Sequence, residues 1–354
     1  IRSLTPDGYQ PFVVQMVIKM KKKDVVLSGI RATGKLHLGN YLGAMKFFAQ
    51  LSQDESKECF FFIANLHTLT TKTDPDDIKR DLKEIVLDFI SVGINPSIST
   101  IFAQSSVPET CELTWLLGCL TPVADLERMP HFKDKKDKKE AMGEIINSGL
   151  LTYPVLMAAD ILGPRANLVP VGEDQHPHVE LTRELARRFN TIYGETFPIP
   201  ELLSSEAVRV PGLDGSGKMG KSDYNTLDLS DSPEAIRKKV AKALTDPARE
   251  RRTDPGDPSV CNIYALHALI SSGHELVEVS EGCKSAGIGC TDCKEILSKN
   301  IVNILSPIQQ KKSELVGKGV DFPLEVLNEG GRRARKIIAA TVEEVKDKMG
   351  VPMY

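Results

Sequence analysis

The sequence has no apolar run of the roughly 18 residues that a membrane-spanning helix needs, and its start lacks the layout of a signal peptide. The chain has seven cysteines, an odd number, which argues against a disulfide framework in the absence of an export signal. The formal net charge of −3 is too small for a general polyanion binder. Internal repeats and low-complexity tracts are also missing. We therefore expect a cytoplasmic globular protein with neither a membrane nor DNA as a partner.

The pattern of apolar residues changes once along the 354 residues, a length that is sufficient for two domains. Buried-strand patterns alternate with helical ones between residues 24 and 190, beginning with DVVLSGI and continuing with segments that start CFFFI, TIFA and LVPV. This alternation predicts an α/β fold with a Rossmann-type parallel sheet. Later segments have mostly helical spacing. We expect a catalytic domain over 24–225 with an inserted helical segment, an all-helical domain over 226–354, and a poorly structured leader or artificial extension over 1–23.

A glycine-rich turn, GIRATGKLHLGN (29–40), follows the first predicted strand. In parallel sheets of this type, ligands bind at the carboxyl ends of the strands. A turn that opens a helix presents free backbone N–H groups, which suit an anion, and His37 could donate a hydrogen bond to a phosphate. The spacing is neither the dinucleotide pattern G-x-G-x-x-G nor a P-loop. A turn that merely packs tightly remains the alternative.

A second candidate for phosphate binding is the loop KMGKS (218–222). Two lysines separated by two residues on a glycine-rich loop can surround a polyphosphate and neutralise its charge. Taken alone, such a loop is more often an exposed basic loop without a ligand. Its presence in the same chain as the 29–40 turn makes phosphate binding the more specific interpretation.

These two elements, followed by a helical C-terminal third, resemble the class I aminoacyl-tRNA synthetases. HLGN (37–40) is similar to the HIGH signature, and KMGKS is similar to KMSKS with Gly220 in place of the first serine. The longer segments SGIRATGKLHLGNYLGA, LTYPVLMAADIL, VPVGEDQ and HVELTRELARRFN resemble the tryptophanyl-tRNA synthetases from residue 25 onward. The tyrosyl enzymes are the runner-up, although they usually carry glutamine at the position of Met157. A synthetase-like RNA-binding protein that charges no tRNA is a second alternative.

The resemblance implies that the chain activates L-tryptophan with ATP and Mg²⁺ to form tryptophanyl-adenylate and pyrophosphate, then transfers tryptophan to tRNA(Trp). It implies catalytic roles for His37, Lys218 and Lys221. It also implies an ATP site made of Arg31, Ala32, Thr33, Gly39, Asn40, Gly172, Glu173, Asp174, Val210, Lys218, Met219, Gly220, Lys221 and Ser222. A homodimer is implied as the assembly. The lysine-rich segment 127–140 is a candidate contact with the acceptor stem of tRNA, because lysines there can meet phosphates.

The segment YPVLMAADI places Tyr153, Met157 and Asp160 on one helix face, at spacings of four and three. A buried Asp there must find a donor or bear the cost of a desolvated charge, and an Asp that caps a neighbouring turn is the alternative. The resemblance implies that Asp160 accepts a hydrogen bond from the indole N–H. It implies a tryptophan site made of Asp160, Tyr153, Met157, His67, Gln175, Val169 and Val171.

Four of the seven cysteines fall in the last third of the chain, at Cys261, Cys283, Cys290 and Cys293. Four thiolates suit either zinc or an iron–sulfur cluster, and four unrelated buried cysteines are the alternative. GCKSAGIGCTDCK (282–294) resembles a segment of those tryptophanyl-tRNA synthetases that hold a four-iron, four-sulfur cluster in the anticodon-binding domain, although the first gap here is one residue shorter. We expect such a cluster, with zinc as the alternative.

Overall fold

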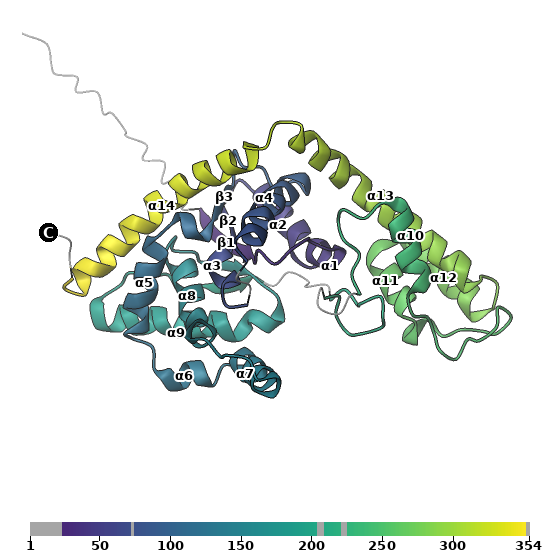
Figure 1. The fold of residues 1–354 in the computed structure, drawn as a ribbon, viewed down its shortest axis with the longest axis horizontal. Helices are drawn as coiled ribbons and strands as arrows, with labels where there is room; N and C mark the ends of the chain where they lie inside the picture. The colour runs from purple at the N-terminus through teal and green to yellow at the C-terminus, as the bar shows by residue number, and fades with distance from the viewer. Residues whose placement is uncertain (1–22, 72–73, 204–208, 221–224, 352–354) are drawn as a thin grey trace, which may run out of the picture.

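The computed structural model describes residues 23–71, 74–203, 209–220 and 225–351 (Figure 1). Its centre is a five-stranded parallel sheet with the strand order β3-β2-β1-β4-β5. The strands are β1 (Asp24–Ile30), β2 (Lys57–Ile63), β3 (Thr100–Ala103), β4 (Leu168–Pro170) and β5 (Glu201–Leu203). The order runs outward from β1 on one side and from β4 on the other. The sheet therefore has its topological switch point between β1 and β4, where doubly wound sheets bind ligands.

The central strands are continuous apolar runs because helices cover both faces of the sheet. Phe60 and Phe62 of β2 belong to one buried cluster, whereas Phe61 and Ile63 belong to the other. Successive side chains of a strand point to opposite faces, so a parallel strand that is buried on both sides needs apolar residues at every position. The predicted Rossmann-type fold is confirmed, together with its first four strands. The prediction missed β5, which is only three residues long and partly exposed.

Two helices of the sheet region begin at a residue whose side chain caps the helix, Asp74 before α4 (Pro75–Ser91) and Asn147 before α8 (Ser148–Leu162). In α4, the side chain of Asp74 accepts hydrogen bonds from the backbone N–H groups of Asp76 and Asp77, at 3.1 and 2.8 Å. Such a cap satisfies N–H groups that have no partner within the helix. The other helices of this region are α1 (Leu38–Asn40), α2 (Lys46–Ser52), α3 (Asn65–Thr68), α5 (Glu109–Gly118), α6 (Val123–Glu127), α7 (Pro130–Met142) and α9 (His176–Tyr193), with a π-helical turn at Tyr41–Met45.

The elements that the structure describes after residue 225 are helices. They are α10 (Pro233–Lys242), α11 (Asn262–Ile270), α12 (Gly273–Lys284), α13 (Cys290–Val316) and α14 (Phe322–Lys348). Helices α10 to α13 gather beyond α1, and α14 runs back along the sheet region (Figure 1). Among the helices that the structure describes, none combines the length and the apolar character that a membrane crossing requires.

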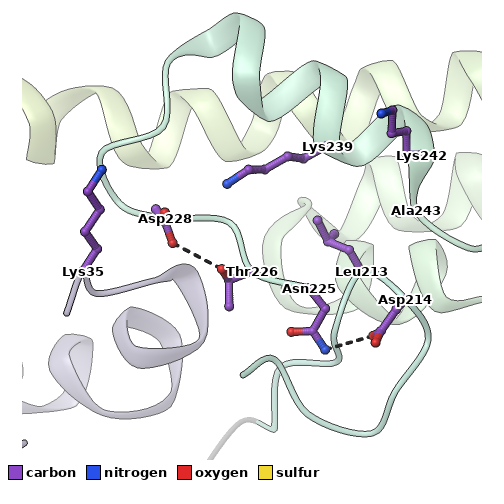
Figure 2. Close-up of a pocket in the computed structure, with 9 residues that line it drawn as sticks. All are labelled: Lys35, Leu213, Asp214, Asn225, Thr226, Asp228, Lys239, Lys242 and Ala243. Carbon is purple, nitrogen blue, oxygen red and sulfur yellow. Dashed lines mark hydrogen bonds between the residues drawn. The ribbon is translucent and has the colours of Figure 1, made fainter. Parts of the chain in front are cut away.

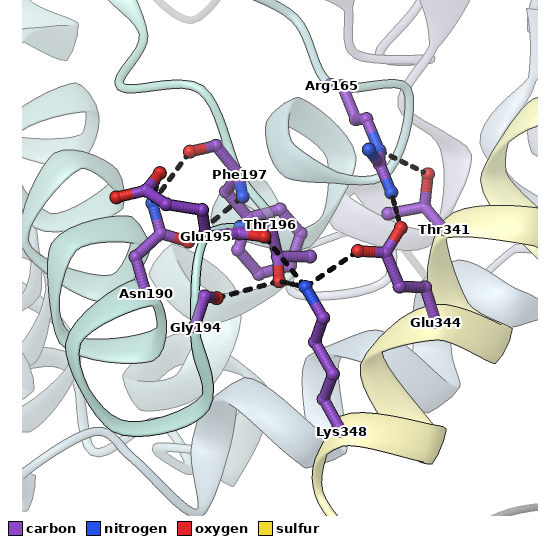
Figure 3. A network of polar contacts seen from close by, with 9 residues as sticks. All are labelled: Arg165, Asn190, Gly194, Glu195, Thr196, Phe197, Thr341, Glu344 and Lys348. Atoms are coloured by element: carbon purple, nitrogen blue, oxygen red, sulfur yellow. Dashed lines mark hydrogen bonds and ion pairs between the residues drawn. The ribbon is translucent and has the colours of Figure 1, made fainter.

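Helix α14 packs against β3, α4 and α5. A Cβ atom at Gly330 would lie 1.8 Å from the carbonyl oxygen of Ile101 in β3, so glycine is required for this approach. Near its C-terminal end, Glu344 pairs with Arg165, and the Lys348 ammonium lies 2.7 Å from the Thr196 hydroxyl (Figure 3). The division of the chain at residue 225 stays a prediction. Within the region 226–354, the last helix is part of the packing around the sheet.

Candidate active site

A cavity of about 560 Å³ opens at the carboxyl ends of β1, β2 and β4. All seven residues predicted for the tryptophan site line it. Its lining residues are Leu27, Ser28, Gly29, Arg31, Phe62, Ala64, His67, Thr70, His131, Asp134, Lys135, Lys138, Tyr153, Met157, Asp160, Ile161, Val169, Val171, Asp174 and Gln175. The lining combines apolar walls with a few polar groups, which is typical of small-molecule sites.

Asp160 is the most deeply buried carboxylate of this cavity, at 5% exposure. Its Oδ2 lies 3.0 Å from His67 Nε2 and 2.8 Å from Gln104 Nε2, and its Oδ1 lies 3.0 Å from the same Gln104 nitrogen. Burial raises the pKa of Asp160, and the hydrogen bonds and charge of its neighbours only partly oppose that rise. The buried carboxyl group therefore has the partners that its desolvation requires. Gln104 was not among the site residues predicted from the sequence.

Tyr153 lines the cavity and forms a neutral pair with His178. The Tyr153 hydroxyl lies 2.8 Å from His178 Nε2. Burial raises the pKa of Tyr153 to about 12 and lowers the pKa of His178 to about 4, with the charge of His131 adding to the second effect. At neutral pH both groups are uncharged, so this wall is polar without carrying charge.

Helix α7 contributes a basic face to the same cavity, which the sequence analysis missed. His131, Asp134, Lys135 and Lys138 line the cavity from this helix. Burial lowers the pKa of Lys135, and the charge of nearby Arg31 lowers it further. The spacing i, i+4 and i+7 of the basic residues puts them on one helix face and could have indicated this role. Two cations close to one another at the cavity suit an anionic group of a ligand.

The HLGN turn lies directly beside the chain around KMGKS. The Leu38 N–H donates to the Leu227 carbonyl at 2.7 Å. A Cβ atom at Gly39 would lie 2.9 Å from His37 Nδ1 and 3.4 Å from Met219 Cβ, so the absence of a side chain at Gly39 permits this close packing. Over the described residues, these two distant elements therefore lie in contact, and their joint role in phosphate binding stays a prediction. Lys221 and Ser222 lie outside the described residues, as do residues 1–22 of the predicted leader.

The remaining predicted ATP-site residues flank these elements. The Met219 N–H donates to the Val210 carbonyl at 2.8 Å, and the Gly220 N–H donates to Asn225 Oδ1 at 2.8 Å. The loop that follows β1 is fixed by backbone hydrogen bonds: the Ala32 N–H donates to the Thr68 hydroxyl at 3.0 Å, and the Thr33 N–H donates to the Arg31 carbonyl at 2.9 Å. At the start of α1, the His37 N–H donates to Asn40 Oδ1 at 3.0 Å.

The segment Gly172–Glu173–Asp174 connects the cavity to the lysine of the KMGKS loop. Burial raises the pKa of Asp174, but the hydrogen bond from Gln175, at 2.9 Å, and the charge of Lys218 outweigh it and lower the pKa overall. A Cβ atom at Gly172 would lie 2.8 Å from Asp174 Oδ1, so glycine leaves room for this carboxylate. An ionised Asp174 is thus held at the cavity within electrostatic reach of Lys218.

A second cavity, of about 550 Å³, lies behind the KMGKS-bearing loop and shares no lining residue with the first (Figure 2). Lys35, Lys239 and Lys242 face it together with Asp214 and Asp228. Asn225 also lines this cavity, and its side-chain nitrogen donates hydrogen bonds to Asp214 Oδ1 at 2.9 Å and to the Ser216 hydroxyl at 2.7 Å. These contacts fix the start of the loop that carries Lys218.

The four late cysteines lie close enough to influence one another. Burial, together with the charges of Cys261, Cys283 and Cys290, raises the pKa of Cys293 to about 12. Cys283 Sγ lies 3.7 Å from a guanidinium nitrogen of Arg249. Over the residues that the structure describes, no three or more His, Cys, Asp or Glu side chains converge as a ready site for a single metal ion. The four thiols are nevertheless brought into one neighbourhood from three segments of the chain.

The sequence and the fold of this chain both match those of known tRNA synthetases. A family model described as tRNA synthetases class I (W and Y) matches residues 19–306. Tryptophan–tRNA ligases of Deinococcus radiodurans and Thermotoga maritima are 44% and 43% identical over 328 residues, which is 92% of this chain and 98% and 99% of theirs. A crystal structure of tryptophanyl-tRNA synthetase from Campylobacter jejuni, complexed with ADP and tryptophan, superposes with a TM-score of 0.81 at 35% identity and covers 92% of this chain and 99% of that one.

Proposed function

The chain belongs to the class I tryptophanyl-tRNA synthetases and is a tryptophan–tRNA ligase, and we propose that the cavity around Asp160 is where it activates tryptophan. The tryptophan carboxylate attacks the α-phosphate of ATP, and pyrophosphate leaves. The aminoacyl group of the resulting adenylate then passes to the terminal ribose of tRNA(Trp). No protein nucleophile is needed, so the residues act by positioning the reactants and by stabilising charge.

The observation that carries this proposal is a buried carboxylate beside apolar cavity walls. Asp160 is held by His67 and Gln104 and accepts the indole N–H, which is the only polar atom of the tryptophan side chain. Met157, Val169 and Val171 supply the apolar walls of the cavity. Methionine is adaptable and makes favourable contacts with aromatic rings. A site that is built to pair with a ring N–H rejects side chains without one, because its own buried acceptor is then left unpaired.

The triphosphate of ATP binds between the HLGN turn and the KMGKS loop in this proposal. Backbone N–H groups of the turn and His37 contact the phosphates, and Lys218 and Lys221 neutralise the leaving pyrophosphate. Gly172, Glu173 and Asp174 lie beside the ribose and the substrate ammonium. Mg²⁺ would enter with ATP as part of the substrate and would offset the charge of the phosphates. The contact of Gly39 with Met219 supports this assignment because it brings the two elements together.

The activity is tested by charging tRNA. Purified protein, ATP, Mg²⁺ and tRNA(Trp) should yield tryptophanyl-tRNA at a rate that depends on added L-tryptophan. The same mixture with L-tyrosine and tRNA(Tyr) should give no charged product. A preparation that forms the adenylate but transfers nothing to tRNA(Trp) would contradict the second half of the proposal.

The acceptor stem of the tRNA lies against α7 in this proposal. The helix turns its cavity-facing residues toward the amino acid, whereas Lys133 and Lys136 are exposed to solvent. Lysines at such positions bind phosphates without reading sequence. The helical region 226–354 is proposed to contact the anticodon.

We propose a homodimer that forms through exposed apolar residues of α5, of the end of α7 and of the segment that follows α7. Trp115, the only tryptophan of the chain, is 73% exposed, and Met142 and Ile145 are 72% and 86% exposed. Thr114, the neighbour of Trp115 in α5, lines a hollow of about 450 Å³ together with Leu69 and Cys111. Apolar groups of this size are commonly covered by a partner. Sedimentation velocity should show a dimer, and Trp115→Glu should convert it to a monomer; a wild-type monomer at micromolar concentration would contradict the proposal.

A four-iron, four-sulfur cluster is proposed at Cys261, Cys283, Cys290 and Cys293. The mutual influence of the four thiols and the cationic Arg249 beside Cys283 fit a group that carries several thiolates. When bound, the cluster would link the start of α11 to α12 and α13 and so stabilise this helical region.

Metal analysis and a visible spectrum of anaerobically purified protein test this site. We expect four irons per chain with the broad visible absorption of a cluster, and loss of both in Cys290→Ser. The exposed Cys119 supplies a matched control, and Cys119→Ser should keep the full iron content. One zinc per chain, or iron that survives Cys290→Ser, would rule the cluster out.

A further inference from the structure

Gln104 is a buried amide that joins three elements around the proposed tryptophan site. It is 1% exposed and opens the short 3₁₀ turn Gln104–Ser106 that follows β3. Its Nε2 donates to both carboxylate oxygens of Asp160 on α8, at 3.0 and 2.8 Å. Its Oε1 accepts the backbone N–H groups of Leu66 and His67 on α3, at 3.0 and 3.3 Å. Because a carboxylate can only accept and a backbone N–H can only donate, the orientation of the amide is fixed by its partners.

We infer that Gln104 is a positioning residue that holds the Asp160 carboxylate in the rotation that receives the indole N–H. A donor that reaches both oxygens prevents the carboxylate from turning about its last bond. Asp160 Oδ2 accepts from both His67 and Gln104, whereas Oδ1 has Gln104 alone among the hydrogen bonds of the described residues. Oδ1 thus keeps the greater remaining capacity to accept a hydrogen bond. The inference rests on the proposed role of Asp160 in binding tryptophan.

The same amide also fixes His67, the other partner of Asp160. Its oxygen accepts the backbone N–H groups of Leu66 and His67 in α3. The Gln104 side chain therefore donates to the carboxylate itself and also positions His67, the second donor. The turn that carries Gln104 also packs against helix α14. A Cβ atom at Gly331 of α14 would lie 2.7 Å from the Ser106 hydroxyl oxygen, which shows how closely this helix packs against the turn. A recognition group supported by rigid elements keeps its geometry better than one on a free loop.

The test compares L-tryptophan with an analogue in which sulfur replaces the ring N–H, β-(3-benzothienyl)alanine. The preference for tryptophan is the ratio of the two kcat/KM values in ATP–pyrophosphate exchange. Gln104→Met replaces the amide by an apolar chain of similar length. Gln104→Glu keeps an acceptor for Leu66 and His67 but replaces the donor by an acid. Both variants should lower the preference by about 10- to 100-fold, mainly through a higher KM for tryptophan.

Asn65 supplies the matched control because it joins the same two segments without touching Asp160. Its side chain exchanges hydrogen bonds with Ser105 at 2.7 and 3.0 Å. Asn65→Ala should therefore keep the full preference for tryptophan over the sulfur analogue. If Gln104 acted only by stabilising the fold, its variants would slow both substrates equally and the preference would not change.

The outcomes separate this inference from the proposed function. A wild-type enzyme that uses both compounds equally would refute the role of Asp160 itself. A wild-type enzyme that prefers tryptophan, with the same preference in Gln104→Met and Gln104→Glu, would refute the role of Gln104 and leave that of Asp160 intact. If Gln104→Met fails to fold, the nearly isosteric Gln104→Glu still decides the question.

Discussion

Replacing Asp160 by alanine should reduce kcat/KM for tryptophan in ATP–pyrophosphate exchange by about 10³-fold, because the indole N–H would enter a buried site that has no acceptor for it. The indole N–H would lose its acceptor, and the side-chain nitrogens of His67 and Gln104 would lose theirs. Buried donors without a partner bear their full desolvation cost. The KM for ATP should change by less than about threefold, since Asp160 touches only the amino-acid side of the proposed site.

Asp88 on α4 is a matched control for the loss of a buried carboxylate. It is 3% exposed, lies 2.6 Å from Lys312 on α13, and does not line the cavity. Asp88→Asn should lower the thermal stability while leaving the KM for tryptophan unchanged. An unchanged KM for tryptophan in Asp160→Ala would remove the carboxylate from substrate recognition.

Replacing Lys218 by alanine should lower kcat for adenylate formation by about 10²- to 10³-fold, the usual cost of removing one group that stabilises charge in the transition state. Negative charge grows on the departing pyrophosphate, and Lys218 lies on the loop that meets the HLGN turn. The KM for tryptophan should change little, because the indole pocket is not altered. Single-turnover formation of adenylate, followed by rapid quench, measures this step directly.

Lys242 serves as the control lysine for this experiment. It lines the second cavity behind the same loop (Figure 2), away from the cavity around Asp160. Lys242→Ala removes one positive charge from the neighbourhood but should leave the rate of adenylate formation within about twofold of wild type, because exposed charges are screened over such distances. Equal losses in both lysine variants would mean that the effect is one of general charge rather than of contact with pyrophosphate.

The sheet was predictable because its signal is local. A parallel strand between two helical layers needs a run of apolar residues, and β2 shows this run in Phe60, Phe61 and Phe62. β5 was not predicted, because its three partly exposed residues are too few to show an alternating pattern of apolar side chains. The packing of α14 against the sheet region was also not predicted, since a helical pattern of apolar residues does not indicate which surface the helix covers. That surface is set by contacts with residues far away in the sequence, such as the close approach of Gly330 to the backbone of Ile101.

The site was predictable where its residues belong to recognisable segments and not where the fold brings polar groups together. Asp160 and Tyr153 were found from the helix segment that resembles the tryptophanyl enzymes. Gln104 was missed because its hydrogen bonds reach α8, 56 positions further along the chain, and a lone glutamine after a strand carries no local signal. The basic face of α7 was interpreted only as a tRNA contact, because the sequence does not show that the helix borders the cavity.

The central claim is that one cavity recognises an indole through Asp160 beside the loops that hold ATP. Amino-acid-dependent ATP–pyrophosphate exchange by the purified protein, without tRNA, tests this claim most directly. With L-tryptophan, rapid exchange should appear, and with L-tyrosine the value of kcat/KM should be at least about 10³-fold lower. Exchange that tyrosine supports as well as tryptophan, or that neither amino acid supports, would contradict it.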